Sequence, residues 1–69
     1  MYIVIEIQTK ADQTVGNFGW AFSSRAEAFA KYHAVLSAAA VSALPVHAAV
    51  ILDNRGRQIA AQHFEHAGT

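Results

Sequence analysis

The sequence contains no cysteine, which excludes thiol catalysis, thiolate metal sites and disulfide bonds. Without a disulfide to indicate an oxidising compartment, the expected location is the cytoplasm. Charged residues are also scarce, at 14% of the chain. Five are basic and five are acidic, so the formal net charge is zero. Nucleic-acid binders and membrane-surface proteins use an excess of positive charge to hold phosphate groups. We therefore expect neither a nucleic-acid partner nor a membrane partner.

Long apolar runs are absent as well. The longest stretch without a charged residue, residues 32–52, is interrupted by Ser37, Ser42, Pro45 and two histidines, which is unfavourable for a membrane span. We interpret it as a buried helix end that leads into a buried strand. Residues 1–7 have no basic leader and contain Glu6, so we do not expect a signal peptide.

The chain length sets a limit on stability. Its 69 residues predict one domain over residues 1–69, and a hydrophobic content of 54% argues against disorder. Surface scaling gives roughly 6,500 Å² buried on folding, and its apolar part stabilises the fold by about 100 kcal/mol. Ordering the chain costs about the same at ~1.5 kcal/mol per residue. The net folding free energy of a single copy is therefore near zero, so we expect self-association to bury additional apolar surface.

The first half of the chain predicts a hairpin followed by a helix. Residues 2–9 and 15–22 alternate as strands do, with polar residues 10–14 as the loop between them. Ser24 and Glu27 form a capping box, from which we expect a helix to about Ser42, ended by Pro45. Glu27 and Lys31 have ion-pair spacing. The apolar stripe of this helix comprises Ala28, Phe29, Tyr32, Val35, Leu36, Ala39 and Ala40.

The second half predicts another hairpin, with strands at residues 46–52 and 57–65. In the turn at residues 53–56, Asp53 suits the first position and Gly56 the positive φ of a bulged type I turn. This turn places His47 opposite His63. A four-residue loop is the alternative, and it places Val46 opposite His63.

These elements predict an α+β fold of order ββαββ, a four-stranded antiparallel sheet with one helix packed on one face. We expect the first strand to be central, giving the strand order 2-1-3-4. One helix leaves the other face of the sheet uncovered. The residues expected there are Tyr2 and Val4, with either Val46 and Val50 or Ile51 and Ile59.

Few residues suggest chemistry. No catalytic residue is identified, because the acids are scattered, the serines are explained by caps and no glycine-rich phosphate loop is present. The alternating Phe18, Trp20 and Phe22 could stack on bases, but this pattern is more typical of a core against a helix. As cross-strand neighbours, His47 and His63 could bind zinc or another transition metal, although no third ligand is evident. We expect no cofactor otherwise.

Several segments together resemble a known group of proteins. They are IEIQT (5–9), EAFAKYH (27–33), VLSAAAVS (35–42), PVH (45–47), DNRG (53–56) and His66. The pattern is similar to very short proteins of gut-type bacteria and their prophages, over nearly the whole chain. No activity is assigned to that group, so the resemblance implies an expressed small domain and transfers no functional residue.

The sequence therefore favours a non-catalytic module over an enzyme. We expect a small self-associating structural or protein-interaction module, a homodimer or larger homo-oligomer formed through the uncovered sheet face. The alternative function is a small metal- or ligand-binding protein that uses His47 and His63.

Overall fold

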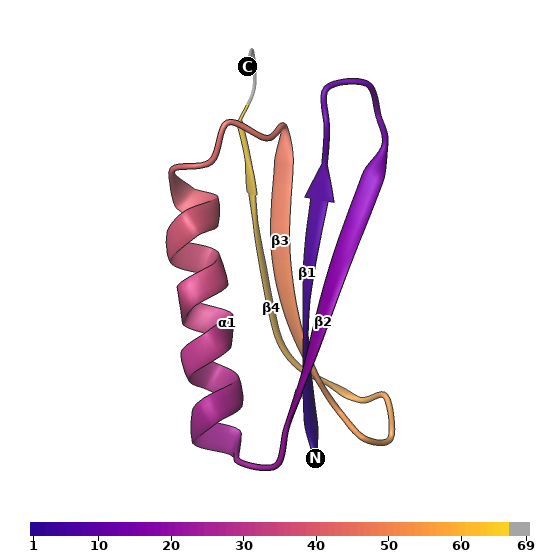
Figure 1. The fold of residues 1–69 in the computed structure, drawn as a ribbon, viewed down its shortest axis with the longest axis vertical. Coiled ribbons are helices and arrows are strands. Elements are labelled where there is room, and N and C mark those ends of the chain that lie inside the picture. The colour runs from indigo at the N-terminus through magenta and orange to yellow at the C-terminus, as the bar shows by residue number, and fades with distance from the viewer. Residues whose placement is uncertain (67–69) are drawn as a thin grey trace.

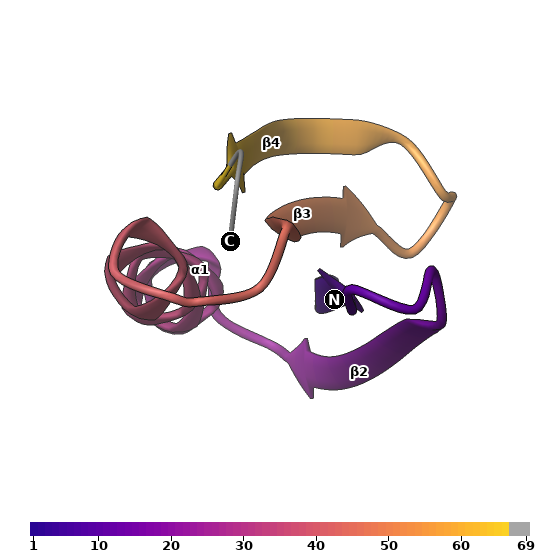
Figure 2. The ribbon, with the colours of Figure 1, turned by 90° about the horizontal axis from the view of Figure 1, so that it is seen from above.

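The computed structural model describes residues 1–66 and has the predicted element order ββαββ (Figure 1). Its five elements are β1 (Tyr2–Thr9), β2 (Val15–Phe22), α1 (Arg25–Ala40), β3 (Val46–Asp53) and β4 (Gln58–Glu65). The strands form one antiparallel sheet of order β2-β1-β3-β4, which confirms the predicted α+β fold and strand order. Seen from above, α1 lies along one side of the sheet and the opposite side has no second layer of described residues (Figure 2).

Helix α1 begins where the capping signal predicts. The Ser24 hydroxyl accepts a hydrogen bond from the backbone N–H of Glu27 at 3.3 Å. The helix ends at Ala40, two residues before the predicted Ser42, because Val41 and Ser42 donate to carbonyls only three residues back in a tighter final turn. Within residues 1–66 no ion pair joins Glu27 to Lys31, whose ammonium instead lies 4.0 Å from the centre of the Trp20 ring.

The hydrophobic core lies between α1 and one face of the sheet, and it corrects one prediction. Tyr2 and Val4 were expected on the uncovered face, but Val4 is fully buried beneath the helix and Tyr2 packs against the same core. Cross-strand pairing explains the choice, because it places Val4 between Trp20 and Ile51. The helix therefore covers the face that carries the aromatic residues, which have the largest surface to bury.

The second hairpin follows the predicted turn but not the predicted register. The Asp53 N–H donates to the Arg57 carbonyl at 3.0 Å, and Gly56 has a φ of 82°, as expected for the bulged turn. Beyond the turn Ile51 pairs with Ala60, which leaves Ile59 as an extra residue in β4.

This bulge changes which β4 side chains face the helix. His47 pairs with Phe64, and His63 pairs with Ala48, so both predicted partners of His63 are wrong. The shift has a physical reason, because Ile59 and Ala60 both pack against the core. It also turns Phe64 toward the helix side and leaves the polar His63 exposed.

Candidate functional site

The face of the sheet that α1 does not cover carries most of the remaining apolar side chains. We call it the open face and define it by the residues of β1 and β3 that alternate with the buried ones, and by their cross-strand partners. In its centre Ile5 pairs with Val50, Ile3 with Leu52 and Ile7 with Ala48. All of its central residues are only half-buried in the single chain. They are Ile3, Ile5, Ile7, Val46, Ala48, Val50 and Leu52.

The edges of the open face are more polar than its centre. On β4 it carries His63 and Glu65, whose Nε2 and Oε2 atoms lie 3.2 Å apart. On β2 it carries Asn17, Gly19 and Ala21. An apolar centre with a polar edge is the arrangement found in protein interfaces.

The structure separates the two histidines proposed as metal ligands. His47 faces the helix and is 4% exposed, whereas His63 lies on the open face and is exposed. The metal site was predicted from a cross-strand pairing of His47 with His63, and this pairing does not occur in the structure. Within residues 1–66 no group of three histidine, cysteine or acidic side chains is placed to hold a metal ion. The other histidines are His33, which is exposed on α1, and His66, whose Nε2 hydrogen-bonds the Ala39 carbonyl at 2.9 Å.

A largely buried polar pair that was not predicted from the sequence lies beneath α1. The Nε2 atom of His47 lies 2.5 Å from Oε2 of Glu6, which also accepts a hydrogen bond from Gln8 at 3.0 Å. Burial would raise the pKa of Glu6, but the hydrogen bonds from His47 and Gln8 and the nearby charges of His47 and Lys31 lower it overall. The one available signal was Glu6 itself, a charge in an apolar strand.

The aromatic residues of β2 are only partly covered. Trp20 and Phe22 pack against the core as predicted, whereas Phe18 is 51% exposed. The Phe18 and Trp20 rings stack with their centroids 6.5 Å apart, and Lys31 lies over Trp20. The helix therefore protects the β2 edge less than it protects the middle of the sheet.

Comparison with protein-family models, curated proteins and solved structures finds no match to this chain. The resemblance to short bacterial and prophage proteins stays an expectation. Among residues 1–66, no helix combines the length and the apolar character needed to cross a membrane.

Proposed function

We propose that this chain is a small self-associating module that forms a homodimer by stacking the open faces of two copies. The observation that carries the proposal is the row of Ile3, Ile5 and Ile7 beside Val50 and Leu52, on the face opposite the helix. A second sheet at the usual distance of about 10 Å would cover these side chains. The product would have the layers helix, sheet, sheet, helix.

The size of the open face supports this arrangement. Each strand has 8 residues and is therefore about 27 Å long, and four strands are about 19 Å wide. The projected area is about 500 Å² per copy, or about 1,000 Å² in total. This reaches the lower range of specific interfaces, about 1,000 Å².

The composition of the core supports it too. One copy fully buries only small and medium side chains, the largest being Ile51 and Val4. Full burial of an aliphatic side chain contributes about 1.5–3 kcal/mol to the free energy of folding. Covering the open face would therefore substantially raise the marginal stability expected for a single copy.

The test is the mass in solution of the whole chain. Light scattering at micromolar concentration is expected to give about twice the 7.4 kDa of one chain. Replacing Ile5 by lysine at the centre of the open face is expected to give monomers, because stacking would bury an unpaired charge on each copy. The control Ala34→Lys adds the same charge on the exposed side of α1 and is expected to leave the mass unchanged.

A second variant covers the case in which Ile5→Lys does not fold. Threonine keeps the β-branched shape, so Ile5→Thr with Val50→Thr preserves strand propensity while it removes apolar surface from the open face. We expect this double variant to fold and to dimerise at least tenfold more weakly. A monomeric wild-type chain, or a dimer that Ile5→Lys and the double variant leave intact, would refute the proposal.

A further inference from the structure

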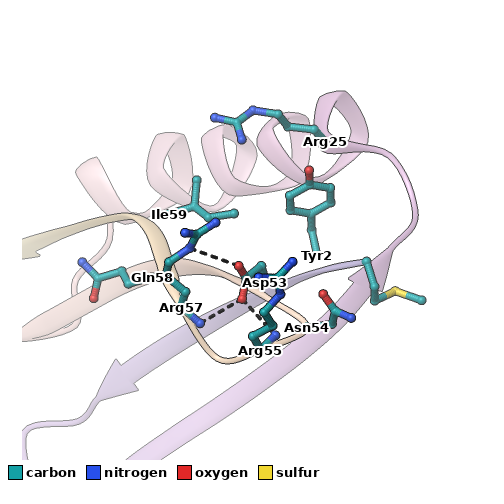
Figure 3. Close-up of a pocket in the computed structure, with 9 residues that line it drawn as sticks. Tyr2, Arg25, Asp53, Asn54, Arg55, Arg57, Gln58 and Ile59 are labelled. Atoms are coloured by element: carbon teal, nitrogen blue, oxygen red, sulfur yellow. Dashed lines mark hydrogen bonds and ion pairs between the residues drawn. The ribbon is translucent and has the colours of Figure 1, made fainter.

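A pocket at the end of the molecule near the β3–β4 turn gathers most of the positive charge of the chain. It has a volume of about 410 Å³ and lies between the start of α1, the start of β1 and the turn (Figure 3). Three of the five lysine and arginine residues of the chain line it, namely Arg25, Arg55 and Arg57. Arg55 and Arg57 belong to the β3–β4 turn, and the fold brings Arg25, from the start of α1, to the same pocket.

The one acidic residue that lines the pocket is already engaged. Oδ1 of Asp53 accepts hydrogen bonds from the backbone N–H groups of Arg55 and Arg57, both at 2.9 Å, and Oδ2 accepts from Nε of Arg57 at 3.2 Å (Figure 3). These bonds, with the charges of both arginines, lower the pKa of Asp53. The carboxylate holds the turn in shape and presents Arg55 and Arg57 at the pocket.

The remaining donors of the pocket face no second acid among its lining residues. Within residues 1–66 the guanidinium of Arg55 makes no hydrogen bond. The guanidinium of Arg57 makes a single bond, to Asp53, and 76% of the Arg57 side chain is exposed. The guanidinium of Arg25 lies 5.0 Å from the centre of the Phe29 ring and makes no hydrogen bond within residues 1–66; in Figure 3 its side chain runs along α1 at the helix side of the pocket. Tyr2 adds a hydroxyl, and Gln58 adds a side-chain amide.

We propose that this pocket binds the phosphate group of a small molecule. Three guanidinium groups against one carboxylate leave two positive charges, which matches a phosphate dianion near neutral pH. Guanidinium forks bind phosphate oxygens in pairs, and each such bond is charge-assisted. The volume lies within the range of small-molecule sites and exceeds what a bare phosphate needs, so an organic group would also fit. Because one chain supplies every lining residue, this inference does not rest on the proposed dimer.

The test is a titration of the whole chain with inorganic phosphate, followed by ¹H–¹⁵N correlation spectra at pH 7.5 and constant ionic strength. We expect saturable shifts at the amides of Arg25, Arg55, Gly56 and Arg57. Ribose 5-phosphate is expected to bind at least as tightly as phosphate. Acetate is expected to bind more weakly, because it carries one charge. Equal or tighter binding of acetate, or weaker binding of ribose 5-phosphate than of phosphate, would refute the assignment to a small organic phosphate.

Variants at the pocket complete the test. Arg55→Gln removes a guanidinium that makes no hydrogen bond within residues 1–66, so the fold is expected to persist and phosphate binding to weaken about tenfold. Arg25→Gln is expected to act in the same direction. The control Lys10→Gln removes a charge from the β1–β2 loop, outside the lining residues, and is expected to leave binding unchanged. An unchanged affinity in Arg55→Gln and Arg25→Gln, or an equal loss in Lys10→Gln, would refute a specific pocket.

Discussion

The carboxylate of Glu6 on β1 and the imidazole of His47 on β3 meet beneath the helix with 2.5 Å between Oε2 and Nε2. Both side chains lie on the covered face, with 15% and 5% of their side-chain surfaces exposed. Nδ1 of His47 is buried without a hydrogen-bond partner among the described residues, so Glu6 is the main polar partner of that ring. The pair links the two central strands within the hydrophobic layer.

The acid sensitivity of the fold should therefore depend on Glu6. Its pKa in the folded state is lowered from 4.5, so the stability it contributes is present above that value and lost as the pH falls below it. Glu6→Gln is expected to flatten this part of the profile and to cost about 1 kcal/mol near pH 7. Urea denaturation between pH 7 and pH 3 measures both effects. The exposed Glu65→Gln is the matched control, and an acid response that Glu6→Gln leaves unchanged would contradict the prediction.

The two histidines of the second hairpin should differ strongly in their effect on stability. His47→Ala leaves the Glu6 carboxylate without its main partner in a largely buried position, and is expected to cost about 3 kcal/mol. His63→Gln changes an exposed side chain and is expected to stay within about 0.5 kcal/mol of the wild type. Equal costs, measured by thermal or urea denaturation, would favour a cross-strand pair of these histidines over the bulged register.

Among the glycines of residues 1–66, Gly56 should tolerate alanine least. Its φ of 82° disfavours a side chain, while an added Cβ would meet no atom within 4 Å, so the cost is purely one of backbone conformation. We expect Gly56→Ala to destabilise the fold by about 1 kcal/mol. Gly16→Ala, where the space is equally open and φ is ordinary, should not lower the denaturation midpoint.

The helix start offers a fourth measurement. Ser24→Ala removes the acceptor for the Glu27 N–H and is expected to cost about 1 kcal/mol, whereas Ser24→Asp, which restores a capping oxygen, should recover most of it. Ser37→Ala, on an exposed part of the same helix, serves as the control. If Ser24→Ala and Ser37→Ala have the same denaturation midpoint, the cap is not a source of stability.

Sequence patterns identified the elements of this fold well because each rests on local chemistry. Alternation defined β1 and β2, the Ser24 cap fixed the start of α1, and the need for positive φ at Gly56 fixed the turn. Such local patterns could not predict which face of the sheet the helix covers. Both faces of β1 carry large apolar residues, and only pairing with Trp20 and Ile51 decides which face the helix covers.

The register of β4 and the buried pair were not predictable for a related reason. Ile59 and Ala60 are both apolar, so the alternation gives no sign that one of them is an extra residue. Glu6 and His47 are 41 residues apart, and their contact follows only from the pairing of β1 with β3. The arginine pocket likewise needs the start of α1 to be placed beside the β3–β4 turn before its three arginines come together.

The strand order also determines how the chain folds. Each hairpin joins neighbours in sequence, whereas β1 and β3 pair across the whole helix, from Tyr2 with Asp53 to Thr9 with Val46. A hairpin alone is at best marginally stable in water. The core beneath α1 draws on strands of both hairpins, so we expect neither half to persist once the β1–β3 pairing opens. The two halves must then form and melt together, in a single cooperative transition. Trp20 fluorescence from the first hairpin and amide signals of Gly56 in the second should therefore follow one and the same unfolding curve.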